Sequence, residues 1–276
     1  MMLAALALAG REFTRFLRQP QRVIGAVAQP LMFWLFLGAG MGTSFRPAGL
    51  ALGGSDNISY LEYFYPGVMV MMLLFASVFA CITIIEDRDA GFLQGVLVAP
   101  VSRMSIVLGK VFGATAIALV QVLLFTVAAP FLGLSLSAFG LALLLLGFVL
   151  TSIGFAGLGF LLAWGMRSTA GFHAIMMVFL MPLWMLSGAL FPISGAPGWM
   201  NVVMLVNPVF HALEIIRAPF YGDGLALLGQ SGYLVSLAVV VAWAALSLLG
   251  SMKRVSAREK GGVKAPAAAH AGRPLT

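Results

Sequence analysis

Long uncharged stretches of apolar residues dominate this chain, and they limit the folds that it can adopt. Six runs of membrane-crossing length are visible, at residues 23–40, 65–85, 106–131, 141–166, 171–191 and 232–250. A hydrocarbon core about 30 Å thick takes roughly 20 apolar residues of helix. Inside lipid a helix satisfies its own backbone, whereas a β-barrel would show short alternating segments. Because 61% of the residues are hydrophobic and 9% are charged, the sequence predicts an all-α integral membrane protein with six spans.

Three regions are expected along the chain. Residues 1–22 are predicted to form an amphipathic interfacial helix, with its arginines directed to lipid headgroups and its apolar side formed by Leu6, Phe13, Phe16 and Leu17. A frayed N-terminus is the alternative, whereas a secretory signal is disfavoured because the arginines follow the apolar stretch. Residues 23–250 are expected to form the six-helix domain, and residues 251–276 a basic disordered tail.

Basic residues are distributed unequally between the two sides of the membrane. If both termini lie on one side, that side carries 14 of the 16 lysines and arginines, and the other side carries only Arg46 and Arg217. Because cytoplasmic loops are enriched in Lys and Arg, both termini are expected in the cytoplasm. Topology therefore accounts for the net charge of +7, and no nucleic-acid partner is expected.

A charged stretch, EDRDAGFLQGVLVAPVSR at residues 86–103, separates the second and third runs. Its carboxylates crowd one end, and apolar residues then recur with the spacing of one helical face, at Phe92, Leu93, Val96 and Leu97. Pro100 is expected to stop this helix, and Ser102 to cap the next. The pattern predicts a short helix on the membrane surface, although the charges alone also fit a simple water boundary between two spans.

This stretch resembles the cytoplasmic loop of type 2 ABC transporter permeases, in which an acidic pair precedes E-x-G-[TF]-L-[EQ] and L-[VL]-[TA]-P-[VL]-S-R runs. The matching positions are Glu86, Gly91, Phe92, Leu93, Gln94, Leu97, Ala99, Pro100, Val101, Ser102 and Arg103, with Asp89 at the acidic position. The segment VNPVFHALEIIRAPFYG, at residues 206–222, is similar to the family's N-P-x-x-[HY]-x-[IL]-[DE]-x-[IL]-R segment. The resemblance covers residues 10–250.

The resemblance implies the permease of an ATP-driven multidrug, lipid or polysaccharide exporter in a bacterial inner membrane. Such a permease pairs with a second copy, with a homodimer favoured over a heterodimer, and with separate ABC ATPase subunits. The expected ATPase-coupling residues are Glu86, Asp87, Arg88, Asp89, Gly91, Phe92, Leu93, Gln94, Leu97, Pro100, Ser102, Arg103 and Arg167. Of these, Phe92, Leu93 and Leu97 are expected to insert into a cleft of the ATPase.

An external gate is expected on re-entrant helices before the last span. Its candidate residues are Asn207, Pro208, His211, Glu214 and Arg217. The alternative for Glu214 and Arg217 is an exposed helical ion pair of little energetic value. For the substrate path the resemblance points to the first, second and fifth spans, whose soft apolar side chains suit drugs or lipids but also ordinary packing: Met69, Met71, Met72, Phe75, Phe79, Met176, Met177, Met181 and Trp184.

The energy source is expected on another chain, because the sequence lacks a G-x-x-x-x-G-K-[ST] phosphate loop. ATP is thus expected on the partner, with no cofactor, metal or catalytic residue in this chain. An ion-coupled secondary transporter or a channel is the alternative, but the spans contain only His173 and Lys110 as ionisable groups, and Lys110 is expected to snorkel to the surface. His211 and Glu214 alone make no metal site. Cys81 is interpreted as a small apolar filler, and Gly109 and Gly113 as positions of close helix approach.

Overall fold

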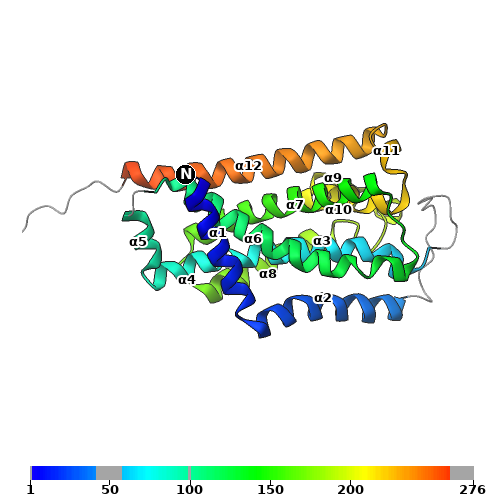
Figure 1. Ribbon diagram of the computed structural model, residues 1–276. Coiled ribbons are helices and arrows are strands. Elements are labelled where there is room, and N and C mark those ends of the chain that lie inside the picture. The colour runs from blue at the N-terminus through cyan, green and yellow to red at the C-terminus, as the bar shows by residue number, and fades with distance from the viewer. Residues whose placement is uncertain (1, 42–57, 99–100, 262–276) are drawn as a thin grey trace, which may run out of the picture.

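The computed structural model describes residues 2–41, 58–98 and 101–261, and within these ranges the chain is helical with no strand. Arg46 and Pro100, named above, lie outside the described residues. Long helices run side by side (Figure 1): α2 (Pro20–Met41), α3 (Tyr60–Ala80), α6 (Arg103–Thr126), α7 (Ala138–Gly165), α8 (Thr169–Met185) and α12 (Ser231–Gly261). The shorter elements are α1 (Met2–Leu17), α4 (Thr83–Asp89), α5 (Phe92–Val98), η1 (Ala129–Leu132), η2 (Ile193–Gly195), α9 (Gly198–Val206), α10 (Pro208–Tyr221) and α11 (Gly224–Leu227).

Five helical segments in the described part of the chain are long and apolar enough to cross a membrane: Val23–Met41, Tyr60–Asp89, Arg103–Thr126, Ala138–Gly165 and Ser231–Ser256. They confirm the all-α membrane fold and match five of the six expected spans. The remaining run, 171–191, is only partly covered by α8, whose 17 residues make about 25 Å of helix. Beyond α8 the chain turns at Gly188, whose φ of 82° suits glycine. Next, α9 and α10 meet at 81°, as expected for broken or re-entrant helices.

Serine caps set the start of four of these helices. The hydroxyls of Ser59, Ser102, Ser137 and Ser168 each accept a hydrogen bond from the backbone N–H three residues later, at distances of 3.0–3.3 Å. These bonds satisfy donors that a helix leaves free in its first turn. The predicted cap at Ser102 is confirmed.

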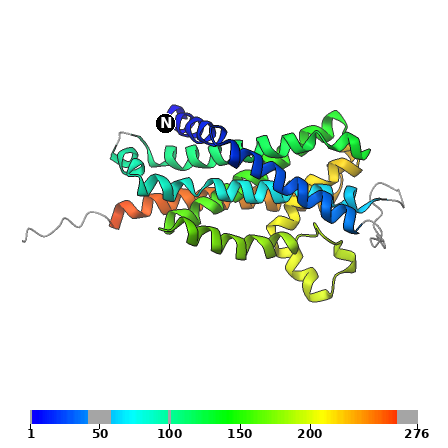
Figure 2. The same ribbon diagram turned by 90° about the horizontal axis from the view of Figure 1, so that it is seen from below.

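Helix α3 lies at the centre of the bundle and contacts α2, α6, α7, α8 and α10. A neighbouring helix end satisfies one of its buried hydroxyls: that of Tyr65 donates to the Phe125 carbonyl at 2.6 Å. In the other direction, the Trp184 indole of α8 donates to the Gly67 carbonyl of α3 at 2.9 Å. Figure 2 shows α2 crossing the front of the bundle with α8 along one edge. The resulting core is rigid around α3, because large aromatic side chains fill it.

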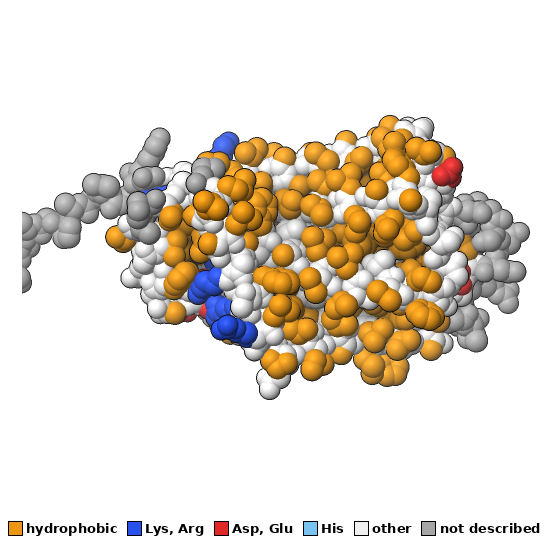
Figure 3. All heavy atoms as spheres, in the orientation of Figure 1, with side chains coloured by type: hydrophobic (Ala, Val, Ile, Leu, Met, Phe, Trp, Pro, Cys, Tyr) orange, Lys and Arg blue, Asp and Glu red, His pale blue; other side chains and the backbone are white. Residues whose placement is uncertain are grey.

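The two ends of the bundle differ in chemistry. The ends of the described chain, at α1 and α12, lie at the same end as α4 and α5 (Figure 1), which we call the α5 end. Figure 3 shows apolar side chains over the middle of one face, with Lys and Arg gathered toward the α5 end. Only 17% of the apolar window of α2 and 28% of that of α12 are buried within the chain. These two helices therefore present most of their apolar surface to lipid or to another subunit.

The expected boundary of the tail at residue 251 is wrong, because α12 continues through Gly261. The Ser251 hydroxyl donates to the Gly157 carbonyl at 2.9 Å, and Val255 is 1% exposed. Lys, Arg, Ala and Glu in this segment favour helix, so the span extends past the apolar run. Residues 262–276 lie outside the described part.

Candidate functional site

The corner between α4 and α5 is built around Gly91. Its φ of 75° is a left-handed conformation that glycine adopts without strain, and it turns the chain out of α4. Helix α5 follows at once, at Phe92–Val98. The short helix expected from the sequence is therefore present, joined to α3 through α4.

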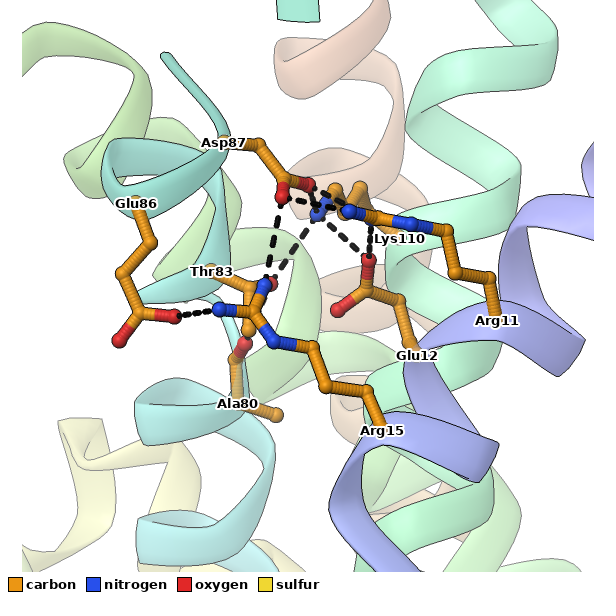
Figure 4. A network of polar contacts seen from close by, with 8 residues as sticks. All are labelled: Arg11, Glu12, Arg15, Ala80, Thr83, Glu86, Asp87 and Lys110. Carbon is orange, nitrogen blue, oxygen red and sulfur yellow. Dashed lines mark hydrogen bonds and ion pairs between the residues drawn. The ribbon is translucent and has the colours of Figure 1, made fainter. Parts of the chain in front are cut away.

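A cluster of charged side chains lies directly beside this corner (Figure 4). The Lys110 ammonium of α6 donates to Glu12 Oε1 at 2.7 Å, to Thr83 Oγ1 at 3.1 Å and to the Asp87 carboxylate. From α1, Arg11 donates to the two oxygens of Asp87 at 3.0 and 2.9 Å. Lys110, Glu12 and Asp87 are only 4%, 4% and 2% exposed. Buried charges of this kind are tolerated only when they are paired, as they are here.

Arg15 extends the cluster along α1. One guanidinium nitrogen lies 2.7 Å from Glu86 Oε2, and the other lies 3.3 Å from Asp87 Oδ1. Three cations thus face three carboxylates, which makes the cluster electrically balanced. The hydrogen bonds to Asp87 are the largest cause of the raised pKa of Arg11, so its guanidinium stays charged.

Helix α1 reaches this position because two glycines of α6 let it approach. A side chain at Gly109 would meet Leu8 and the Ala5 carbonyl, and one at Gly113 would meet Glu12. The prediction of close approach at Gly109 and Gly113 is confirmed.

Two expectations about charge at this end are wrong. Lys110 does not snorkel, because buried carboxylates from two other helices surround it. Arg11 and Arg15 pair with carboxylates of α4, so they are not reserved for lipid headgroups. The apolar side of α1 agrees partly with expectation: Leu6 and Leu17 are exposed and available to lipid, whereas Phe16 is buried. Helix α1 is therefore fastened to α4 and α6 by ion pairs.

Helix α5 presents a different surface from the one expected. Leu93 is 4% exposed and belongs to the core of this chain, so it does not face a partner. Phe92 is 36% exposed, with the Arg11 guanidinium 3.7 Å from its ring centroid. Val98 is 87% exposed, and Gln94 and Gly95 are also exposed, whereas the side chain of Leu97 lies outside the described atoms. The sequence pattern identified an apolar face, but this chain uses part of that face itself.

Arg88 connects the two loops that the sequence predicts to lie in the cytoplasm. Its guanidinium donates to the Met166 carbonyl at 2.7 Å and to the Trp164 carbonyl at 2.9 Å, at the end of α7. The neighbouring turn carries Arg167, which is exposed, and Ser168, the cap of α8. The remaining predicted residues here are exposed at Asp89 and Ser102 and half-buried at Arg103. Arg88 therefore joins α4 to the end of α7 and to the α7–α8 turn through two hydrogen bonds.

A cavity of about 430 Å³ lies next to the charge cluster, between α1, α2, α3, α6 and α8. Its apolar wall includes Met71, Met72, Phe75, Phe79, Met177 and Met181. Its polar wall includes Glu12, Arg15, Gln29, Thr83, Gln121 and His173. Glu12, Arg15 and Thr83 thus belong to both the cavity and the charge cluster. A ligand in the cavity would touch the side chains that hold α4 in place.

The apolar residues proposed for the substrate path divide into two groups. Six of the nine line the cavity, whereas Met69, Met176 and Trp184 are at most 1% exposed and serve as packing. The packing interpretation is therefore confirmed for these three residues, and the substrate path stays a prediction for the other six.

The expected gate residues at the α10 end form anchors between helices. Asn207 caps α10 through Val209 N–H at 2.9 Å and donates to the carbonyls of Leu183 and Leu186 at 2.6 and 3.0 Å. Pro208, the next residue, occupies the first turn of α10, where its missing N–H costs nothing. These contacts fix the 81° corner against the end of α8.

His211 uses both ring nitrogens within the chain. One lies 3.1 Å from Ser236 Oγ and the other 2.9 Å from the Leu205 carbonyl. The residue therefore joins α10 to α12 and to the end of α9.

Arg217 is buried, contrary to the alternative of an exposed pair. It is 7% exposed, lies 3.8 Å from the half-exposed Glu214, and places its guanidinium 4.5 Å from the Tyr63 ring centroid. Its Nη2 donates to the Gly188 carbonyl at 3.0 Å, which also accepts from the Tyr63 hydroxyl at 2.7 Å. Arg217 thus joins α10, α3 and the turn after α8.

Substituting Arg217 with lysine is expected to lower stability by about 1–2 kcal/mol, because an ammonium cannot stack flat on Tyr63. Thermal unfolding in detergent would measure this change. The matched substitution Glu214→Gln should change stability by under about 0.5 kcal/mol, since that pair is long and partly solvated. Equal effects of the two substitutions would contradict the anchoring role.

Sequence reasoning missed three residues of this site, Glu12, Gln29 and Gln121. Glu12 is the only acid in α1, and its partner Lys110 lies inside an apolar run, a costly placement that itself signals a hidden counter-charge. Gln121 and Gln29 are amides within apolar helices, and their convergence on one cavity becomes visible only in three dimensions.

Comparisons with known proteins agree with this architecture. The family described as ABC-2 type transporter matches residues 4–221. The transport permease ycf38 of Cyanophora paradoxa is 32% identical over 76% of this chain and 71% of its own. Nodulation protein J of Rhizobium meliloti is 29% identical over 82% of this chain and 85% of its own. The daunorubicin resistance ABC transporter permease protein DrrB1 of Streptomyces coeruleorubidus is 26% identical over 83% of this chain and 81% of its own.

Proposed function

Because the chain belongs to the ABC-2 type transporter family, as a multi-pass transmembrane permease subunit, we propose that it exports a hydrophobic or amphipathic compound. The compound enters from the cytoplasm or the inner leaflet, and a separate ABC ATPase subunit supplies the energy. The α5 end faces the cytoplasm of a bacterium, in keeping with the excess of Lys and Arg at that end.

The cavity beside the charge cluster is the observation that carries this proposal. Its volume of about 430 Å³ falls in the range of small-molecule sites, and its apolar wall of Met and Phe suits an oily ligand. Two relatives point to the same class of substrate, since one is named for daunorubicin resistance and another as a multidrug ABC transporter permease.

The ATPase docks on the exposed part of α5 and on the α7–α8 turn. Phe92 and Val98 supply exposed apolar surface, and Arg88 transmits a movement of one loop to the other. Because α4 continues into α3, such a movement reaches a helix that lines the cavity. The movement that the ATPase drives is thereby delivered to the substrate path.

A second copy of the permease completes the pathway. Helices α2 and α8 flank the cavity, and α2 buries only 17% of its apolar window within the chain. We propose that the cavity opens between these two helices toward a neighbouring subunit, which would close the path from lipid.

The test is to purify the tagged chain from its own host and photolabel the preparation with 8-azido-ATP. The wild-type chain should carry a labelled ATPase subunit, and the double variant Phe92→Asp with Val98→Asp should lose it, because charge would replace the exposed docking surface. The matched variant Phe92→Tyr with Val98→Ile should retain it.

Export itself is checked in inverted membrane vesicles with N-phenyl-1-naphthylamine, an uncharged apolar dye, as the probe. Uptake should require ATP and should be absent in the aspartate double variant. Transport driven by an ion gradient without any ATPase would contradict the proposal and favour a secondary transporter.

A further inference from the structure

Gln121 lies in the wall of the cavity, in the middle of α6, and the residue is 4% exposed. Its amide makes no hydrogen bond among the described residues and is accessible from the hollow, since it is not one of the polar atoms that the protein encloses without a partner. Buried polar groups in proteins nearly always have a partner, because leaving one unmade is costly. An amide held in an apolar helix beside a hollow therefore points to a partner that enters the hollow.

The charged groups of the same cavity are already neutralised. Glu12 is paired with Lys110 and Arg11, and Arg15 is paired with Glu86 and Asp87. A ligand with a net charge would have to break these pairs or stay unpaired in a low-dielectric space. Hydrogen-bonding capacity remains on the side chains of Gln121, Gln29 and His173, which come from α6, α2 and α8.

We propose that Gln121 is a specificity-determining residue that hydrogen-bonds a neutral polar group, such as an amide or a hydroxyl, of an otherwise apolar substrate. The apolar body of the ligand lies along Met71, Phe75 and Met177, across the cavity wall. An amide both donates and accepts, so a neutral group with both capacities satisfies it fully. This inference rests on the proposed function and adds the substrate class of that site.

The experiment measures binding without ATP or an ATPase. Purified protein in lipid nanodiscs is titrated with two dansyl sulfonamides that carry six-carbon chains, one ending in a primary amide and the other in a methyl group. Empty nanodiscs give the partition background for each probe. Failure of ATP-driven export would leave this binding result untouched, so the two proposals can fail separately.

In the Gln121→Leu variant the ratio of amide-probe to methyl-probe affinity should fall roughly tenfold, the effect of one lost hydrogen bond. The control Gln230→Leu makes the same chemical change at an exposed position outside the cavity, and it should leave the ratio unchanged. The melting temperature of Gln121→Leu should stay the same or rise, because the substitution removes a buried amide that lacks a partner.

Three results would overturn the inference. An unchanged ratio in Gln121→Leu would mean that water alone satisfies the amide. If neither probe binds specifically to the wild-type protein, the cavity does not bind apolar ligands that carry a neutral polar group. A lower melting temperature in Gln121→Leu would show that the amide stabilises the fold.

Discussion

Replacing Lys110 with methionine is expected to lower the stability of the protein by about 3–5 kcal/mol, the usual cost of removing one partner from a buried ion pair. Methionine has a similar length but removes the cation that pairs with Glu12 and Asp87. These two carboxylates are only 4% and 2% exposed, so water cannot replace the lost partner. The attachment of α1 should weaken as well, because Lys110 is the link between Glu12 and α6. Thermal unfolding in detergent and protease cleavage after Arg11 and Arg15 would measure the two effects.

Two further variants sharpen this prediction. Lys253→Met makes the same substitution at an exposed residue of α12 and should be nearly neutral. Adding Glu12→Gln to Lys110→Met removes one of the stranded carboxylates and should restore part of the lost stability. If Lys110→Met and Lys253→Met behave alike, the charge cluster does not hold α1.

Replacing Arg88 with alanine is expected to uncouple ATP hydrolysis from transport, with export reduced about tenfold or more. The substitution removes two hydrogen bonds from a charged donor, each worth about 1.5–3 kcal/mol, and separates α4 from the end of α7. The exposed part of α5 should still bind the ATPase, because Arg88 points away from it toward α7. Uptake of the same uncharged dye per ATP hydrolysed, measured in vesicles with the co-purified complex, would reveal the loss.

The conservative and control variants separate coupling from general damage. Arg88→Lys keeps the charge but lacks the planar fork that reaches two carbonyls, so it should rescue export only partly. Arg18→Ala removes an exposed arginine at the end of α1 and should leave the ratio of transport to hydrolysis unchanged. Normal coupling in Arg88→Ala would show that the α4–α5 segment and the α7–α8 turn act independently.

Several elements of this site were predictable from local patterns. The short helix α5, the serine cap at Ser102 and the close approach at Gly109 and Gly113 each depend on neighbouring residues, so the sequence pattern sufficed. The exposure of Leu93 was predicted wrongly, because its apolar position fitted both an outward wedge and an inward anchor. Arg217 was ambiguous for the same reason, since only the fold brings Tyr63 and the turn at Gly188 to it.

By itself the sequence determined that this protein lies in a lipid bilayer, and with that its helical architecture. Apolar runs of membrane-crossing length must form helices in lipid, because each backbone has to satisfy its own hydrogen bonds there. Pairing between distant side chains was decided only by the tertiary structure: Lys110 with Glu12 and Asp87, Arg88 with the end of α7, and Gln121 with a cavity. The cost of burying a charge or an amide depends on partners far away in the chain, and helix packing alone selects those partners.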